Sequence, residues 1–106
     1  MIIDHRTYVT HHGKLDEFLQ RYEELGLAVQ QEYLGRDALV GYFVTDIGPL
    51  NQVTHLWRYD SIGDRADRRA AMEQDPRWKR FKTANAGTFA SQENRILRPV
   101  RFSPLK

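Results

Sequence analysis

The sequence predicts a single α+β domain in which four strands and two helical regions follow the order β-α-β-β-α-β. Three observations predict this order. Apolar residues recur at three- and four-residue steps over residues 15–33, as is typical of an amphipathic helix. Residues 39–46 and 52–59 are rich in strand-forming residues and flank a turn sequence. Similar short segments begin and end the chain, whose 106 residues suffice for one domain and not for two.

The first strand is expected over residues 2–10, where Ile, Thr, Tyr and Val are frequent. Strand alternation places Arg6 and Tyr8 on the same face. The helix that follows carries acidic residues in its first turn and stops at Gly35. Gly26 interrupts the apolar pattern of this helix. It indicates either a close contact with a neighbour or an early end of the helix.

The next two strands form a hairpin whose turn contains Gly48 and Pro49. The short loop suits an antiparallel connection. The second strand of the hairpin has two distinct faces because side chains alternate along a strand. One face carries Val53, His55, Trp57 and Tyr59, and the other carries Thr54, Leu56 and Arg58.

The second helical region is expected to consist of two short helices. Ser61 caps the first helix, and Asp64 three residues later completes a variant of the capping box. Pro76 cannot continue this helix but suits the first position of a new one, with Asp75 as its cap. In the second helix, Trp78, Phe81, Asn85 and Phe89 lie near one face.

The last segment, residues 91–106, is expected to be an extended strand. Pro99 lacks a backbone N–H, so this strand belongs at an edge or a bulge. The whole order is the ferredoxin-like pattern, an antiparallel four-stranded sheet with helices on one face. The other face would expose apolar side chains in a monomer of this size. We therefore expect a homodimer formed through the sheet faces.

Composition excludes several classes of function. The chain has no cysteine, which rules out disulfides, thiolate catalysis and cysteine-bound metals. No apolar run approaches the roughly 20 residues that span a membrane, so we expect no membrane span. The N-terminal residues resemble neither a signal peptide nor a transit peptide, and the cytoplasm is the expected location.

Charge is divided unevenly along the chain. Residues 1–60 hold five basic and nine acidic residues, a net charge of −4, and residues 61–106 hold eleven and five, a net charge of +6. Such a division is compatible with contact to nucleic acid or phospholipid. No nucleic-acid-binding motif accompanies the charge. We therefore expect the basic residues to cover an acidic neighbour or a partner subunit, with no nucleic acid as partner.

Several short motifs together resemble the NIPSNAP family. They are Arg6 and Tyr8 two apart in a strand, GKL at residues 13–15, LWRY at residues 56–59 before an Arg-rich helix, and DPRWKRF at residues 75–81. The resemblance implies a dimeric α+β barrel, in which two ferredoxin-like sheets pack face to face. It implies no established mechanism. The wider superfamily of dimeric barrels includes cofactor-independent monooxygenases, lactone isomerases and haem-binding enzymes, which is analogy at the level of fold alone.

The candidate chemistry centres on His55, which lies in mid-strand between apolar neighbours. It suits a general acid or base or an oxyanion partner, and equally a half-buried histidine that is hydrogen-bonded across the sheet. Arg6 and Tyr8 present a cation and a phenol that suit a carboxylate or an enolate. The alternative for Arg6 is an ion pair with an acid such as Asp60 or Glu93.

Aromatic residues supply the candidate ligand-binding wall. They either line an apolar pocket or fill the core between sheet and helices. The residues are Tyr42, Trp57, Tyr59, Trp78 and Phe81. His5, His11 and His12 lack the spacing of a metal site, so we expect neither a metal nor a cofactor.

Three functions fit these residues. The leading hypothesis is that the protein binds a small aromatic or apolar molecule, as a carrier or sensor. The alternative is a cofactor-free oxygenase or isomerase that uses His55 with Arg6 or Tyr8. The third is a scaffold whose surface contacts another protein, which a pocket filled by its own aromatic side chains would favour.

Overall fold

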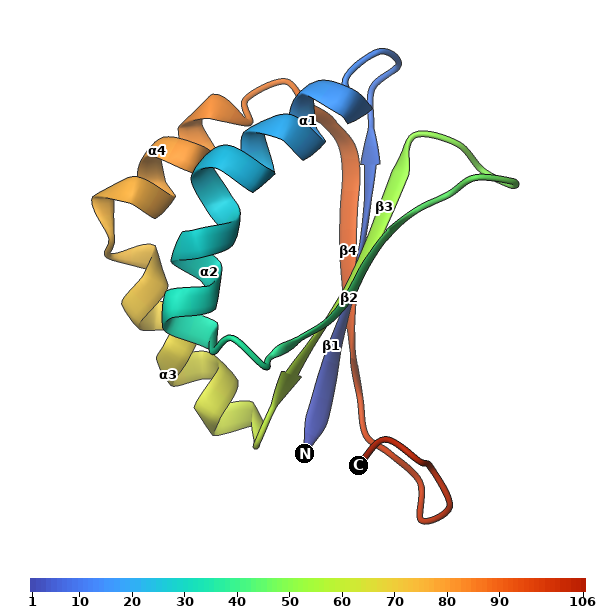
Figure 1. Cartoon of the computed structure of the whole chain (residues 1–106), viewed down its shortest axis with the longest axis vertical. Coiled ribbons are helices and arrows are strands. Elements are labelled where there is room, and N and C mark those ends of the chain that lie inside the picture. Colours follow the sequence, from blue (N-terminus) through green and yellow to red (C-terminus); the bar gives the residue numbers. More distant parts are fainter.

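A computed structural model describes all 106 residues, and its elements follow the predicted order. Helices α1, η1 and α2 form one continuous helix that contains a single π-helical segment, η1 (Figure 1). The elements are β1 (Ile2–Thr10), α1 (Leu15–Arg21), η1 (Tyr22–Gly26), α2 (Leu27–Leu34), β2 (Leu39–Val44), β3 (Gln52–Tyr59), α3 (Ile62–Glu73), α4 (Pro76–Ala84) and β4 (Phe89–Leu97).

The four strands form one antiparallel sheet in the order β2-β3-β1-β4. Strand β1 lies in the middle and pairs with β3 on one side and β4 on the other. All helices pack on the same face of the sheet, which leaves the other face without a covering layer (Figure 1). This arrangement confirms the predicted ferredoxin-like α+β fold.

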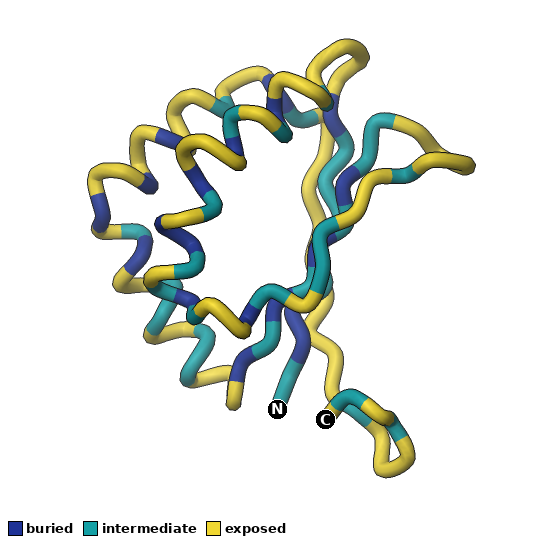
Figure 2. Tube along the Cα trace, in the orientation of Figure 1, coloured by how far each residue is buried: buried dark blue, intermediate teal, exposed yellow.

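The core lies between the helices and the inner face of the sheet. Every second residue of β3 from Val53 to Tyr59 is buried, as its alternation predicts. Figure 2 shows the buried positions along the inner sides of the helices and the central strands, whereas β4 is mostly exposed. Eleven buried residues form the apolar cluster: Phe18, Tyr22, Val29, Leu34, Ala38, Val53, Trp57, Tyr59, Met72, Trp78 and Phe81.

Gly26 marks a close contact and not the end of the helix. The chain stays helical from Leu15 to Leu34 and ends at Gly35, which has a positive φ of 104°. A Cβ atom on Gly26 would lie 2.9 Å from Tyr22 Cδ1 and 3.1 Å from Phe81 Cζ. The missing side chain therefore lets the two rings pack against the π-helical segment.

Both predicted caps of the second helical region are present. Ser61 Oγ accepts a hydrogen bond from the backbone N–H of Asp64 at 3.0 Å, and Asp75 Oδ1 accepts one from the N–H of Arg77 at 2.8 Å. Pro76 is the first residue of α4. Each cap satisfies one of the N–H groups that a helix leaves free at its start.

Three predicted strand boundaries are wrong. Phe89 begins β4 and does not extend α4, because the chain turns between Asn85 and Thr88 with a positive φ of 77° at Gly87. Strand β4 ends at Leu97, two residues before Pro99, so the C-terminal tail lies outside the sheet. Strand β2 ends at Val44, two residues before the predicted end at residue 46.

The basic second half of the chain contacts acids of the first half. Arg65 on α3 binds Asp4 on β1 with an Nε–Oδ2 distance of 2.9 Å, and Arg77 on α4 pairs with Glu32 on α2. The uneven charge along the sequence is thus partly neutralised within the fold. None of the helices has the length and hydrophobicity needed to cross a membrane.

Candidate functional site

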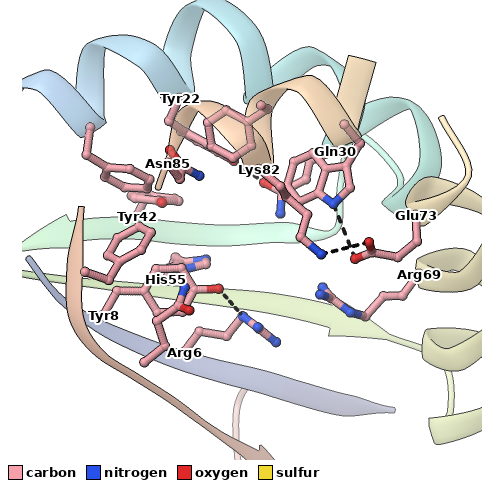
Figure 3. Close-up of a pocket in the computed structure, with 15 residues that line it drawn as sticks. Arg6, Tyr8, Tyr22, Gln30, Tyr42, His55, Arg69, Glu73, Lys82 and Asn85 are labelled. Atoms are coloured by element: carbon pink, nitrogen blue, oxygen red, sulfur yellow. Dashed lines mark hydrogen bonds and ion pairs between the residues drawn. The ribbon is translucent and has the colours of Figure 1, made fainter. Parts of the chain in front are cut away.

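A cavity of about 190 Å³ lies between the helices and the inner face of the sheet (Figure 3). Its lining mixes aromatic rings with charged and amide side chains. The strands contribute Arg6, Tyr8, Tyr42, His55, Phe89 and Gln92. The helices and the turn after α4 contribute Phe18, Tyr22, Gln30, Arg69, Glu73, Trp78, Phe81, Lys82 and Asn85.

The structure brings most of the sequence-predicted site residues to this cavity. Those that line it are Arg6, Tyr8, Tyr42, His55, Trp78 and Phe81. Trp57 and Tyr59 do not line it, although they lie on the same strand face as His55. Both are buried in the apolar cluster, where the helices pack directly on β3.

His55 forms the floor of the cavity and is only 2% exposed. Its Nδ1 accepts a hydrogen bond of 2.8 Å from Trp57 Nε1, two residues along the same strand. Its ring stacks on Tyr42 with a centroid distance of 4.4 Å. It packs against the Tyr8 ring in a T-shaped arrangement with a centroid distance of 4.9 Å. The partner of His55 is thus a neighbour on its own strand and not a group across the sheet.

The hydrogen bond from Trp57 decides which nitrogen of His55 carries the proton. An indole N–H only donates, so Nδ1 must be the acceptor and the neutral imidazole is protonated at Nε2. Burial, reinforced by the Arg6 guanidinium, lowers the pKa of His55 from 6.5 to about 3. His55 is therefore neutral near pH 7. Its buried Nε2–H has no hydrogen-bond partner within the protein.

Arg6 is fixed by its neighbours on β1. Its Nε donates to Tyr8 Oη at 2.8 Å, and one terminal nitrogen donates to Asp4 Oδ2 at 3.0 Å. Asp4 is fully buried and also accepts hydrogen bonds from Arg65 and Asn94. Burial raises the pKa of Asp4, but Arg6 and the hydrogen bonds outweigh it and the net pKa is lowered. The Asp4 carboxylate is therefore charged.

The predicted acid partners of Arg6 are wrong. The sequence suggested Asp60 or Glu93, but the partner is Asp4, two residues earlier on the same strand face. Side chains two apart on one face are close enough for a long arginine to reach. The ion pair leaves several N–H groups of Arg6 without protein partners, since a guanidinium has five donors.

The helix side of the cavity carries charges that the sequence analysis missed. Glu73 Oε2 accepts from Lys82 Nζ at 3.0 Å, and its other oxygen accepts from Trp78 Nε1 at 3.3 Å. Arg69, one turn before Glu73 on α3, forms no salt bridge, and its guanidinium lies beside the Tyr59 hydroxyl. The only sequence signal was the four-residue spacing of Arg69 and Glu73 on α3, and Lys82 on α4 had none. Polar residues facing a cavity look the same in a sequence as polar residues facing solvent.

Aromatic rings form the opposite side of the cavity. Tyr22 stacks on Tyr42 with a centroid distance of 4.8 Å, and the edges of Tyr8 and Phe18 meet Phe89 at 5.2 and 5.0 Å. Burial raises the pKa of both Tyr22 and Tyr42, so both phenols are neutral at physiological pH. Because Tyr22 and His55 stack on Tyr42, this side presents a layer of packed rings to a ligand.

The structure gathers no group of three or more His, Asp and Glu side chains suited to a metal ion. His11 and His12 lie exposed after the end of β1, and His5 lies on the sheet face opposite the cavity. The cavity therefore presents hydrogen-bond donors, cations and aromatic rings as its binding groups.

Fold and cavity define this chain as a ferredoxin-like α+β protein with a cavity that is aromatic on one side and cationic on the other. The chain belongs to the NIPSNAP family, since the sequence model of that family, described as NIPSNAP, matches residues 3–104. The resemblance seen in the sequence motifs is thereby confirmed. A NIPSNAP family protein from Agrobacterium tumefaciens, known from a crystal structure, has 48% sequence identity to this chain. The two structures superpose with a TM-score of 0.93, and the alignment covers 99% of this chain and 98% of the Agrobacterium chain.

The human protein NipSnap homolog 3A is 41% identical over 73 residues, which cover 69% of this chain and 30% of the relative. This chain thus matches less than a third of the length of that relative. The crystal structure of an antibiotic biosynthesis monooxygenase aligns over 94% of this chain and 99% of its own, with a TM-score of 0.66 and 16% identity. At that identity the likeness shows the shared fold alone.

Proposed function

We propose that the protein binds a small planar aromatic molecule in the cavity between its sheet and helices, as a carrier or sensor. The observation that carries this proposal is an unfilled space of about 190 Å³ walled by aromatic rings around the unpaired Nε2–H of His55. An apolar protein cavity of about 150 Å³ accommodates benzene, so this space suits one ring with a short substituent. Buried polar groups normally have a partner, and a ligand oxygen would supply one.

Two measurements test this binding. Mass spectrometry of the denatured protein is expected to reveal a small aromatic molecule that copurifies with it. Calorimetric titration with benzyl alcohol and indole is expected to show binding that Gln92→Trp reduces, because Gln92 is an exposed residue at the cavity mouth. Gln20→Trp, at an exposed position of α1 outside the cavity, is the matched control. Absence of a copurifying molecule together with equal titrations of the two variants would refute the proposal.

A cofactor-independent isomerase or monooxygenase is the second candidate. Arg6 and the Nε2–H of His55 line the same cavity and suit the stabilisation of an enolate oxygen. The imidazole would act as a hydrogen-bond donor, because its remaining lone pair is occupied by Trp57, and the proton taken from the substrate would pass to solvent water. Exchange of the benzylic protons of phenylpyruvate in D₂O, followed by NMR, tests this activity. Exchange that is unchanged by His55→Ala would argue against it.

A protein-interaction scaffold receives less support. Trp78 and Phe81 line the cavity without filling it, and a cavity filled by aromatic side chains was the feature expected of a scaffold. The cytoplasmic location stays a prediction.

The homodimer remains part of the proposal. The sheet face opposite the helices has no covering layer, and Phe43 and Leu97 on it are 58% and 42% exposed. The same face also carries His5, Arg58 and Arg95, so it is mixed in character. A second copy packed there would bury the apolar residues and let the polar ones pair across the interface.

A further inference from the structure

The charges that line the cavity are not balanced. Three are basic, Arg6, Arg69 and Lys82, and one is acidic, Glu73. The acid is already engaged, since Glu73 accepts from both Lys82 and Trp78. Arg6 is compensated by Asp4 behind it. Arg69 is the one cation of the three that forms no salt bridge; its guanidinium lies beside the Tyr59 hydroxyl and feels Glu73 only at longer range.

Arg69 reaches the cavity from α3 and is half-buried. Figure 3 shows its guanidinium group on the side of the cavity where the Arg6 guanidinium and the Lys82 ammonium also lie, with the rings of Tyr22 and Tyr42 at the other end. Like charges that converge in a half-buried space repel one another, and an anion placed among them would relieve the repulsion.

The same positive potential reaches the floor of the cavity. Burial is the main reason that the pKa of His55 is lowered, and both Arg6 and Arg69 add to it because they disfavour a third positive charge. The Nε2–H of His55 needs a hydrogen-bond acceptor, and Arg69 attracts an anion. A negatively charged oxygen satisfies both.

We propose, on the basis of the binding function proposed above, that the ligand is a single-ring aromatic carboxylate. Its ring packs at the end of the cavity formed by Tyr22 and Tyr42, and its carboxylate pairs with Arg69. A guanidinium binds a carboxylate through two parallel hydrogen bonds, which makes arginine selective for this group. The cavity volume of about 190 Å³ accommodates one ring and a short acid side chain.

Matched acids and amides test the charge requirement directly. Benzoate and phenylacetate are titrated into the protein by calorimetry beside benzamide and phenylacetamide, which have the same shape without the charge. The acids are expected to bind at least about tenfold more tightly than the amides. Arg69→Gln is expected to abolish this preference while it leaves the affinity for the amides unchanged.

Arg80→Gln is the control for the change in net charge. Arg80 is an exposed residue of α4 that does not line the cavity, so this variant is expected to keep the preference for acids. Replacing Arg69 breaks no salt bridge, but it removes a guanidinium that lies beside the buried Tyr59 hydroxyl. Arg69→Lys keeps the charge and loses the paired hydrogen bonds, and it is expected to weaken acid binding. This variant tests the same proposal if Arg69→Gln is unstable.

The outcomes separate this inference from the binding function itself. If the amides bind as tightly as the acids, or if Arg69→Gln keeps the preference, the carboxylate proposal is overturned while the cavity remains a binding site. If neither acids nor amides bind and no molecule copurifies, both proposals fail. A neutral aromatic molecule found in the denatured sample would overturn the carboxylate proposal alone.

Discussion

The pair formed by His55 and Trp57 sets the chemistry of the cavity floor. Strand alternation was enough to predict that the two side chains share a face. It did not predict that the indole N–H would occupy Nδ1, because that contact depends on the side-chain conformations of both residues. The hydrogen bond and the burial together convert a candidate acid or base into a neutral donor. The sequence was enough to select His55 as a candidate site residue, but it could not predict which of its nitrogens carries the proton.

The lowered pKa of His55 makes the stability of the protein depend on pH. The unfolded chain binds a proton at His55 below about pH 6.5, whereas the folded protein does so only near pH 3. Between these values the unfolded state binds more protons, so the free energy of unfolding decreases as pH falls. We expect a loss of about 1 kcal/mol per pH unit between pH 6 and pH 5 from this residue. Urea unfolding at each pH measures it.

His55→Asn is the control for this pH dependence. Its Oδ1 takes the place of Nδ1 and can still accept the hydrogen bond from Trp57, and it does not titrate. The variant is expected to show a smaller dependence between pH 6 and pH 5. Equal slopes for the two proteins would mean that His55 is protonated in the folded state as readily as in the unfolded one.

Asp4 connects three elements of the fold. It lies on β1, and its partners Arg65 and Asn94 lie on α3 and β4, at hydrogen-bond distances of 2.9 and 3.2 Å. It also holds Arg6 in place at the wall of the cavity. Alternation indicated that Asp4 and Arg6 share a face, but a carboxylate buried between two arginines could not be foreseen from the sequence. Its position depends on where α3 crosses the sheet.

Asp4→Asn is expected to lower the free energy of unfolding by about 3 kcal/mol, because it leaves two arginines next to a neutral, buried side chain. Glu17→Gln is the matched control, since Glu17 and its partner Lys14 are both about half exposed. That exposed pair contributes at most about 1 kcal/mol. Denaturant unfolding of both variants provides the comparison, and equal losses would contradict a structural role for the buried carboxylate.

The π-helical segment gives Gly26 an unusual response to substitution. Replacing glycine by alanine inside a helix normally stabilises it by up to about 1 kcal/mol. At Gly26 the added methyl group would come within 3.1 Å of the rings of Tyr22 and Phe81. We therefore expect Gly26→Ala to destabilise the protein by about 1–3 kcal/mol.

Gly63 in α3 provides the comparison for Gly26. A Cβ atom there would have only Ser61 Oγ nearby, at 3.8 Å. Gly63→Ala is therefore expected to leave the melting temperature unchanged or to raise it, whereas Gly26→Ala lowers it. A rise for both variants would show that the rings beside Gly26 move aside at little cost.

The order of the elements was predictable because periodicity, caps and turn residues are local signals. The cavity depended on information that is not local. Arg69 and Glu73 look like solvent-facing residues in the sequence, because the apolar stripe of α3 is too narrow to show which of its flanks meets the sheet. Lys82 on α4 looks the same, because it lies next to an apolar face among other basic residues. Phe89 was placed on a helix because its spacing from Phe81 suits one. The turn that starts β4 at Phe89 became apparent only in the structure.

At the scale of the whole molecule, the fold brings the basic second half of the chain against the acidic first half. Basic residues of α3 and α4 neutralise acids of the first half at two ion pairs, Arg65 with Asp4 and Arg77 with Glu32. Arg69 has no such partner and lies at the cavity. Part of the uneven charge in the sequence thus joins the helices to each other and to the sheet, and Arg69 is left at the cavity.

The uncovered sheet face leads to the last prediction, which concerns assembly. Phe43 lies at its exposed surface with its ring over Gly41, where a Cβ atom would come within 2.5 Å of the ring. The glycine therefore gives the ring room to lie over the strand on the uncovered face of the sheet. We expect the protein to sediment as a dimer at micromolar concentration, and Phe43→Asp to sediment as a monomer, because an interface cannot bury an unpaired carboxylate without a large cost.

Ile62→Asp is the control for that experiment. Ile62 is also apolar and 57% exposed, but it lies at the start of α3 on the helix side of the molecule. An acidic residue is stabilised there by the helix dipole. This variant is expected to remain a dimer. A wild-type protein that sediments as a monomer would refute the sheet-face dimer, and dissociation caused by Ile62→Asp alone would place the interface on the helices. Because the cavity lies on the side of the sheet away from the proposed interface, monomeric Phe43→Asp is expected to keep its ligand affinity.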